Sequence, residues 1–368
     1  MSTFSFMKTF NIGLRVLPFA MCALLLHSPG ASAAEAAKAK PRIRILATGG
    51  TIAGSQGSKD EYGYKAGTFK VEDLITAVPA LKDIADISGE QIVNIGSQDM
   101  NDQVWLKLAK RVNEVLKSKD TDAVVITHGT DTMEETAYFL NLVVKSDKPV
   151  VLVGSMRPAT AVGADGPANL YEGVYVAADP KAAKRGVLVV MNDEIHSARD
   201  VEKMNTISLN TFASPERGPI GRVVYGRIVW GAGSPEKRNT THSEFAVDKL
   251  DKLPRVDILY AHANMSPDLI EAAVRSGAKG VVIAGVGDGN MTQEALAILE
   301  KLAKKGTLII RSTRLATGPV LRNSEVDDDK AGFVASGELN PGKARILAQL
   351  ALTKTNDPRK VQEMFYTY

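Results

Sequence analysis

The sequence feature that most constrains the fold is a repeated order of short apolar runs, polar turns and helical patterns. Largely apolar runs occupy 43–47, 123–126 and 150–153, and each leads directly into a polar turn that contains glycine. Between these runs, apolar residues recur at helical spacing at 102–117 and 133–144. Apolar strands separated by helices are typical of a parallel sheet that is covered on both faces.

The second half of the chain repeats this order on a smaller scale. Expected strands and helices alternate there, with strands at 256–260, 281–284 and 307–311, helices at 268–275 and 292–304, and a closing helix at 341–352. Between the two halves, 223–230 alternates as a β-hairpin would, and 231–244 is rich in Gly, Ser, Pro and charge. We therefore predict an α/β fold with a larger N-terminal domain, whose mostly parallel sheet is flanked by helices, and a smaller α/β C-terminal domain.

The first residues have the features of a secretory signal. Lys8 and Arg15 give a basic start, 16–26 is mostly apolar, and Ala31-Ser32-Ala33 is a small-residue cleavage site, with cleavage one residue later as an alternative. A retained N-terminal anchor is the rival interpretation. The predicted organisation is a signal peptide at 1–33, a flexible tail at 34–41, an N-terminal α/β domain at 42–230, a linker at 231–254 and a C-terminal α/β domain at 255–368.

Composition narrows the function classes. Cys22 lies inside the leader, so the exported chain has no disulfide and no cysteine ligand, which fits a periplasm-like compartment. Loss of Lys8 and Arg15 with the leader lowers the formal net charge from +3 to +1. This balance predicts no nucleic-acid partner and no membrane partner. The histidines are widely spaced and match no metal-ligand pattern, so we expect neither a metal nor another cofactor.

Polar side chains follow three of the expected strands at the point where each strand ends. Thr51 follows the first strand, Ser97 and Gln98 follow a strand at 92–95, and Thr130 with Asp131 follows 123–126. Because parallel strands bring their carboxyl ends to one edge, these groups should meet there and suit a small ligand with an ammonium and a carboxylate group. Taken singly, each is more typical of a helix N-cap, as we expect for Asp102 before the helix to 117.

Other catalytic patterns are missing or weak. The sequence has no His-Glu-x-x-His pair, no Gly-x-Ser-x-Gly turn and no Walker-type lysine. Gly285, Gly287 and Gly289 follow a strand and could hold a dinucleotide, but their spacing is wrong for that motif. The stretch 55–68, with Tyr62 and Tyr64, is expected to be a loop and a candidate lid, or else an ordinary surface loop.

Two of these turns resemble a known family. The segments 48–54 and 127–135 together are similar to the two signatures of bacterial L-asparaginases. Further segments that match the family lie at 96–99, 154–158, 199–203 and 325–328. The resemblance covers the whole chain after the leader, and with the leader it implies the type II, periplasmic form.

The resemblance implies a set of catalytic residues. Thr51 would attack the side-chain amide and form an acyl-enzyme, and Tyr64 would close over the site. Thr130, Asp131 and Lys203 would form a second set of hydroxyl, acid and amine groups. Without the family, Lys203 alone would be read as a surface lysine in a salt bridge.

The resemblance also implies how substrate is held. The implied substrate-binding residues are Ser97, Gln98, Thr130, Asp131, Ser155 and Asn290. Ser97 and Gln98 would hold the α-carboxylate, and Asp131 with Glu325 the α-ammonium. Glu325, which also belongs to the implied catalytic set, and Asn290 would come from a neighbouring subunit, in a homotetramer built as a dimer of dimers.

The sequence therefore predicts hydrolysis of L-asparagine to L-aspartate and ammonia, with weaker glutaminase activity. Relatives that prefer glutamine tend to carry Ser-Glu where this chain has Gln98-Asp99. One methylene of substrate is worth only about 1–3 kcal/mol of discrimination, so some glutamine hydrolysis is expected. A periplasmic amino-acid-binding protein without turnover is the alternative.

Overall fold

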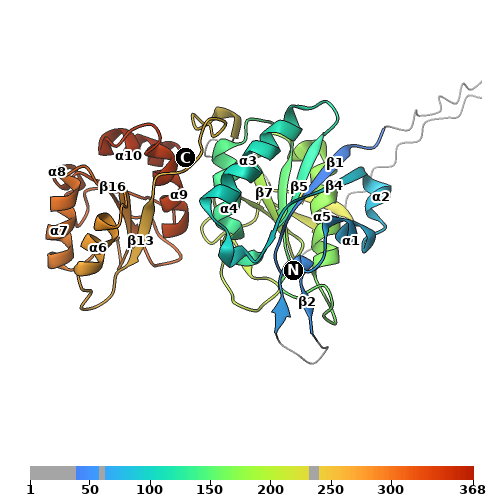
Figure 1. Ribbon diagram of the computed structural model, residues 1–368, viewed down its shortest axis with the longest axis horizontal. Coiled ribbons are helices and arrows are strands. Elements are labelled where there is room, and N and C mark those ends of the chain that lie inside the picture. The colour runs from blue at the N-terminus through green and yellow to red at the C-terminus, as the bar shows by residue number, and fades with distance from the viewer. Residues whose placement is uncertain (1–38, 58–62, 232–239) are drawn as a thin grey trace, which may run out of the picture. The chain divides into compact units, whose positions relative to one another are not determined.

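The computed structural model describes residues 39–57, 63–231 and 240–368 (Figure 1). The predicted signal peptide at 1–33 lies outside the described residues, as does most of the predicted tail. Among the described residues, no helix combines the length and the apolar character that crossing a bilayer requires.

The N-terminal half is built on an eight-stranded sheet with the strand order β12-β11-β8-β7-β6-β5-β1-β4. Its strands are β1 (Arg42–Gly49), β4 (Asp86–Ile95), β5 (Ala123–Thr127), β6 (Val150–Val153), β7 (Val187–Met191), β8 (Glu194–Ser197), β11 (Gly221–Val224) and β12 (Arg227–Trp230). The strands from β4 to β7 pair in parallel, whereas β8, β11 and β12 continue the sheet antiparallel. The predicted mostly parallel sheet is confirmed.

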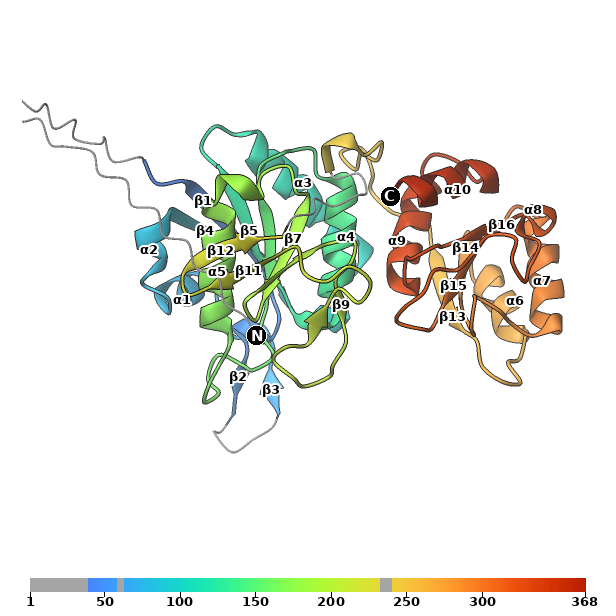
Figure 2. The same ribbon diagram turned by 180° about the vertical axis from the view of Figure 1, so that it is seen from behind.

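Helices cover both faces of this sheet, as the apolar strands require. The helices are α1 (Val71–Thr76), α2 (Leu81–Ile84), α3 (Asp102–Lys117), α4 (Met133–Val143) and α5 (Gly166–Ala178). Alternate residues of β5 enter two different cores: Val124 packs with α3 and α4, and Val125 packs with α1 and α5. Figures 1 and 2 show these two helix layers on opposite sides of the sheet.

The C-terminal half is built on a smaller sheet of four parallel strands in sequence order. Its elements are β13 (Val256–Tyr260), α6 (Asp268–Arg275), β14 (Gly280–Gly285), α7 (Gln293–Ala303), β15 (Leu308–Thr313), α8 (Asp328–Ala331), β16 (Phe333–Ala335), α9 (Pro341–Ala351) and α10 (Pro358–Thr367). One face packs Ile283 against Leu299 of α7, and the other packs Ile310 against Leu347 of α9. Both faces of this sheet are therefore buried as well.

Several sequence predictions agree with the structure to the residue, among them β6, β13 and α6. The hairpin predicted at 223–230 is the β11–β12 pair. One cap was wrong: the N-cap of α3 is Asn101, whose side chain accepts the backbone N–H groups of Gln103 and Val104, and Asp102 is the first helical residue. An N-cap residue has extended backbone, which lets its side-chain oxygen accept the N–H groups two and three residues later, and Asn101 has that backbone.

Four helices were not predicted, the short α2 and α8 and the longer α5 and α10. The sequence of α5 is apolar or small on most sides, so it has no clear amphipathic period. Its Gly173 lies against the sheet so closely that a Cβ there would be 2.3 Å from Val153 Cγ1. A glycine that looks like a helix breaker in the sequence is therefore what allows this helix to approach β6.

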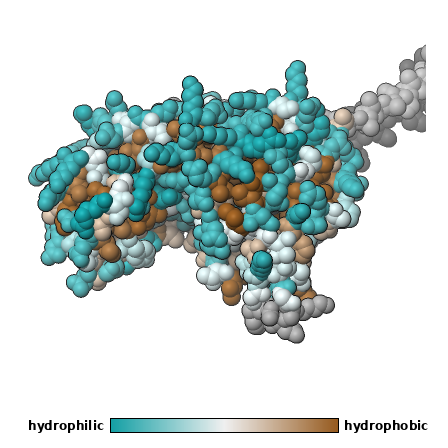
Figure 3. All heavy atoms as spheres, in the orientation of Figure 1, coloured by the Kyte–Doolittle hydropathy of each residue, from teal (hydrophilic) through white to brown (hydrophobic). Residues whose placement is uncertain are grey.

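The surface offers no single large apolar face in the view of Figure 3. Hydrophilic side chains cover most of the face shown, with apolar side chains gathered in separate patches between them. The most exposed large apolar residues are Val162, Ile207 and Tyr225, which lie on loops and turns of the N-terminal half. Isolated apolar groups of this kind are ordinary on protein surfaces.

Candidate active site

The turns that follow β1, β4 and β5 contact one another at one edge of the sheet. A Cβ on Gly50 would lie 2.4 Å from the Cα of Gly129, and a Cβ on Gly129 would lie 2.6 Å from Ser97 Oγ. Gly50 also has a φ of +82°, a conformation that other residues rarely adopt. Only glycine fits at both positions, and the close backbone contact brings the three polar turns together.

Thr51 follows the glycine turn and is nearly buried, with 6% of its surface exposed. Its Oγ1 lies 2.7 Å from the hydroxyl of Tyr64, either of which can donate the hydrogen bond. Tyr64 belongs to β3 (Tyr64–Lys65), which pairs antiparallel with β2 (Ser55–Gln56). The segment 55–68 is therefore a hairpin at its base rather than the plain loop predicted, and residues 58–62 between its strands lie outside the described residues.

A second group of polar side chains lies on the turn after β5. The Lys203 ammonium donates to Thr130 Oγ1 at 2.9 Å and to Asp131 Oδ1 at 2.6 Å. The backbone N–H of Asp131 donates to Ser97 Oγ at 3.1 Å. Four of the predicted site residues are thus joined by hydrogen bonds, and Gly129, which lies against both Ser97 and Gly50, connects them to the turn that carries Thr51.

Lys203 is held in place by residues that the sequence reasoning missed. It lies in the short strand β9 (Glu202–Lys203), and its backbone N–H donates to the carboxylate of Glu134 at 2.6 Å. The other carboxylate oxygen of Glu134 accepts a hydrogen bond from Asn340, the N-cap of α9. Helix α9 of the C-terminal half is thereby connected to the strand that carries the lysine.

Lys343 makes a second connection between α9 and the segment just before β9. It is 1% exposed, and its ammonium donates to the carbonyl oxygens of Arg199 at 2.7 Å and Val201 at 2.6 Å, just before β9. Burial lowers the pKa of this amine, while the nearby carboxylates of Glu134 and Glu202 act in the opposite direction. The sequence did contain a signal, because Lys343 stands four residues before Leu347 and so on the inward face of the closing helix.

The remaining N-terminal predictions lie at the same sheet edge. Gln98 is exposed next to Ser97 in a short 3₁₀ turn. Ser155 follows β6, is fully buried, and donates to the carbonyl oxygen of Arg157 at 2.7 Å. It lies near Ile52, since a Cβ on Gly166 would contact both side chains.

Asn290 and Glu325 lie elsewhere. The Asn290 amide donates to the Glu325 carboxylate, and the backbone of Asn290 pairs with Val286 after β14. In the described part of this chain, none of their hydrogen bonds reaches Thr51 or Thr130. The structure therefore brings together the predicted residues of the N-terminal half and leaves these two as a separate pair.

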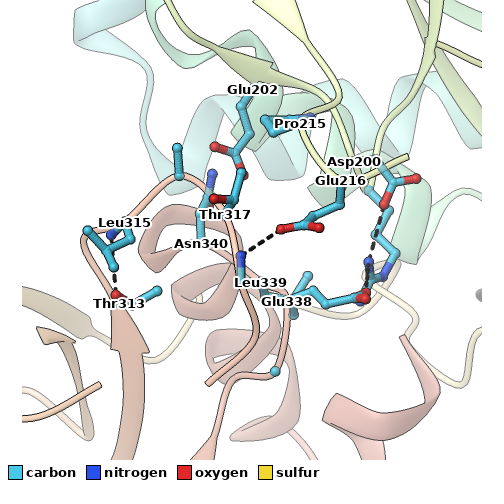
Figure 4. Close-up of a pocket in the computed structure, with 14 residues that line it drawn as sticks. Asp200, Glu202, Pro215, Glu216, Thr313, Leu315, Thr317, Glu338, Leu339 and Asn340 are labelled. Atoms are coloured by element: carbon cyan, nitrogen blue, oxygen red, sulfur yellow. Dashed lines mark hydrogen bonds and ion pairs between the residues drawn. The ribbon is translucent and has the colours of Figure 1, made fainter. Parts of the chain in front are cut away.

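A pocket beside β9 is not the same site. It is lined by Asp200, Glu202 and Glu216 from one side and by Thr313, 315–318 and 337–340 from the other (Figure 4). Glu216 accepts the backbone N–H of Gly318 at 2.6 Å, and Asp200 is paired with Arg199. These carboxylates already have partners within the chain, and no predicted site residue lines the pocket.

Comparison with known proteins gives consistent matches. The model "Asparaginase, N-terminal" matches 42–235, and "Glutaminase/Asparaginase C-terminal domain" matches 255–365. The chain is 54% identical to "Probable L-asparaginase periplasmic" of Haemophilus influenzae, covering 96% of this chain and 99% of that protein. It is 53% identical to "L-asparaginase 2" of Escherichia coli, covering 95% and 98%, and 48% identical to "Glutaminase-asparaginase" of Pseudomonas fluorescens, covering 94% and 96%.

A solved structure is similar as well. The probable cytoplasmic L-asparaginase from Campylobacter jejuni superposes with a TM-score of 0.87 at 48% identity, over 89% of this chain and 100% of that chain.

Proposed function

Because the chain belongs to the asparaginase family, we propose that it hydrolyses L-asparagine to L-aspartate and ammonia, with weaker activity on L-glutamine. One observation carries the proposal: two hydroxyl groups lie on touching turns, Thr51 bonded to Tyr64 and Thr130 bonded to Lys203. An amide whose amino-acid end is bound beside Ser97 and Asp131 would lie within reach of both.

In the proposed mechanism Thr51 Oγ adds to the carbonyl carbon of the side-chain amide. A threonine hydroxyl is a weak nucleophile and needs a partner that takes its proton. Tyr64, at 2.7 Å, receives this proton while its own passes to the departing nitrogen, so the C–N bond breaks and ammonia leaves. Water then hydrolyses the ester on Thr51, which releases aspartate and restores the hydroxyl.

The negative charge that develops on the carbonyl oxygen when Thr51 adds to the amide must also be stabilised. Backbone N–H groups near Gly50 and Thr130 are suitable donors to the developing oxyanion, and one such donor is worth roughly 3–4 kcal/mol in other hydrolases. Thr130, Asp131 and Lys203 form the second catalytic set in this proposal. The hydrogen bonds from Lys203 to the other two residues fix the orientation of the Thr130 hydroxyl.

The amino-acid end of the substrate is assigned to the groups around Ser97. Ser97 Oγ accepts the N–H of Asp131, so that bond leaves its own proton to donate to the substrate α-carboxylate, together with the exposed amide of Gln98. The carboxylate of Asp131, with 58% of its side chain exposed, is assigned to the α-ammonium. Ser155 belongs to the same edge as a buried supporting residue.

Substitution of the nucleophile tests the proposed activity. Thr51→Ala should lower the rate of ammonia release from asparagine by a factor on the order of 10⁴, as for other nucleophiles that act as part of a unit. Thr76→Ala, which removes an exposed helical hydroxyl on α1, is the matched control. Full activity of Thr51→Ala would contradict the mechanism, and asparagine binding without ammonia release by the unchanged protein would support the amino-acid-binding alternative.

Kinetics on both amides test the substrate preference. We expect kcat/KM for asparagine to exceed that for glutamine, because the chain carries Gln98-Asp99 at the carboxylate-binding turn. A value for glutamine that equals or exceeds the one for asparagine would contradict this preference.

We further propose that the active form is a homotetramer built as a dimer of dimers, in which Asn290 and Glu325 complete the site of the neighbouring chain. In a single chain Tyr64 is 46% exposed and Asp131 faces solvent, so the site has room for groups from a partner.

Co-expression of Thr51→Ala and Glu325→Ala chains tests whether Glu325 acts in the site of the neighbouring chain. A mixed dimer has one unaltered site, so about a quarter of wild-type activity should return under random pairing. No recovery would show that Glu325 does not act across the interface.

Export to the periplasm and the domain limits also remain proposals. N-terminal sequencing of protein from the periplasmic fraction should find cleavage after Ala33 or Ala34. Limited proteolysis should cut first within 231–254 if this segment links domains at 42–230 and 255–368. Retention in the cytoplasm, or first cuts inside either domain, would contradict these assignments.

A further inference from the structure

A buried line of hydrogen bonds runs behind the turn that carries Thr130. The indole Nε1 of Trp105 in α3 donates to Thr136 Oγ1 in α4 at 2.8 Å. Thr136 Oγ1 lies 2.9 Å from Nε2 of His128, and His128 Nδ1 lies 2.6 Å from the carbonyl oxygen of Gly129. Trp105 is 3% exposed and the other two side chains are fully buried, so water does not compete for these bonds.

The direction of each bond follows from the chemistry of the groups. An indole N–H can only donate, so Thr136 Oγ1 accepts it and keeps its own proton to give to His128 Nε2. The Gly129 carbonyl can only accept, so His128 Nδ1 must carry the proton that faces it. The opposite tautomer would set a nitrogen lone pair against the carbonyl oxygen at 2.6 Å. Burial lowers the pKa of His128 to about 4, so the ring is neutral near pH 7 and carries one N–H.

The hydrogen bond from His128 to the Gly129 carbonyl oxygen affects the geometry of the turn. The lack of a side chain at Gly129 is required by the nearby Ser97 hydroxyl and Gly50 backbone, and it leaves the turn with more conformational freedom than any other residue would. The peptide group between Gly129 and Thr130 is planar and rigid. Fixing the carbonyl oxygen of Gly129 therefore fixes the N–H of Thr130 on the opposite side and the start of the turn that directs the Thr130 hydroxyl.

We propose that Trp105, Thr136 and His128 act as positioning residues for catalysis, by holding the Gly129–Thr130 peptide group in the orientation that amide hydrolysis needs. These side chains act through the peptide and lie behind the hydrogen-bonded groups assigned to substrate, so they are distinct from the catalytic residues. The inference rests on the proposed function, because it concerns the geometry of the same site.

Two substitutions test the proposal: Thr136→Val, which is isosteric, and Thr136→Ser, which keeps the hydroxyl and loses a methyl group. Valine removes the hydroxyl and breaks the line of hydrogen bonds, so kcat for asparagine should fall about 10-fold to 100-fold while KM changes by less than about threefold. Serine keeps the hydroxyl and should restore kcat to within about threefold of wild type. A folded Thr136→Val protein with unchanged kcat would overturn the proposal, and so would equal losses for valine and serine.

The matched control is Thr127→Val, one residue before His128. In the described part of the chain the Thr127 hydroxyl is fully buried and has no hydrogen-bond partner, so its loss should leave kcat unchanged. If Thr136→Val does not fold, Trp105→Phe gives a second test, because it keeps a smaller aromatic ring against Phe139 and removes the indole N–H donor. An unchanged kcat in Trp105→Phe would then count against the proposal.

The tautomer of His128 is a readout that does not depend on catalysis. The ¹⁵N chemical shifts of the unchanged protein at neutral pH should identify Nδ1 as protonated and Nε2 as an acceptor. Protonation at Nε2 would overturn the proposal even if the enzyme is fully active. The two tests can also disagree. If His128 has the predicted tautomer but Thr51→Ala keeps its activity, the proposed mechanism is wrong and the hydrogen-bonded line is only structural.

Discussion

At the scale of single residues, the proposed chemistry depends on one short contact. Thr51 and Tyr64 are brought together by the β2–β3 hairpin, whose register pairs Gln56 with Tyr64. The Tyr64 ring also lies against Gly54, just after Thr51, since a Cβ on Gly54 would be 3.0 Å from the ring. A phenol next to the nucleophile is thus fixed by backbone pairing as well as by its own hydrogen bond.

This contact predicts a large effect of Tyr64→Phe. The change removes the proton relay and little else, so kcat for asparagine should fall by a factor on the order of 10² or more, as for other positioned acid–base groups. The thermal midpoint should stay close to that of wild type, because the ring of Tyr64 is 46% exposed. Steady-state kinetics and a thermal scan of the variant measure both effects.

A matched control is Tyr175→Phe, which also removes one phenolic hydrogen bond, from Tyr175 to the carbonyl oxygen of Gly226. This bond lies in the β11–β12 turn and away from the hydroxyl cluster, so activity should not change. Equal kcat values for Tyr64→Phe and wild type would exclude Tyr64 from the proton transfer.

At the scale of elements, a short strand is held by a helix from the other half of the chain. β9 has only two residues and pairs with β10 (Phe212–Ala213), which is too little to fix its position alone. Glu134 on α4 and Lys343 on α9 supply the additional hydrogen bonds. The position of Lys203 therefore depends on helices that contribute no reacting group.

This arrangement predicts that Lys343→Met lowers both stability and activity. Loss of the ammonium leaves the carbonyl oxygens of Arg199 and Val201 without their donor, and each such buried group costs about 1–3 kcal/mol. The free energy of unfolding should fall by about 2–4 kcal/mol, and kcat should fall because β9 is less well held. Urea unfolding and steady-state kinetics measure the two effects.

Lys301→Met is the control for this variant, because Lys301 is exposed on α7. It should change stability by less than about 0.5 kcal/mol. A Lys343→Met protein as stable as wild type would mean that the buried amine contributes nothing net, as happens when the cost of burying a charge cancels its hydrogen bonds.

At the scale of the whole molecule, two buried histidines make stability depend on pH. Burial lowers the pKa of both His128 and His196 to about 4. Groups close to His196 include Ser214 on its Nδ1 side, with Glu194 and Arg222 nearby. Below pH 6.5 the unfolded chain takes up protons on these rings while the folded chain does not, so the free energy of unfolding falls as the pH falls towards 4.

The expected loss is about 2 kcal/mol for each histidine between pH 7 and pH 5. Urea unfolding at the two pH values, at one fixed protein concentration, measures it. His196→Gln should lose less stability than wild type over the same interval, because one of the two titrating groups is gone. Burial raises the pKa of Glu172, which acts in the opposite direction over this interval, so the comparison with His196→Gln isolates the histidine contribution. Equal losses of stability for wild type and His196→Gln would contradict this prediction.

Comparison of the sequence predictions with the structure shows where pattern reasoning works. The buried strands β5 and β6 are short continuous apolar runs, and the helices α3 and α6 have a clear helical period. All four were predicted to within one residue at their ends. The antiparallel strand β8 and helix α5 were missed because their residues are apolar or irregular without a period. Their conformation is set by the sheet against which they pack.

The candidate site also has a part that the sequence predicts and a part that only the structure shows. The polar turns that carry Thr51, Ser97 and Thr130 could be placed at one sheet edge from sequence, since parallel strands end on the same side. The order of residue types along the chain also determined where the hydrophobic strands and the turn glycines lie. What only the tertiary structure decided is the support behind them: the hydrogen bond from Trp105 to Thr136, and Glu134 and Lys343 around β9. Those contacts join residues far apart in the chain, and their hydrogen bonds depend on how closely packed helices approach, which no local pattern of residues records.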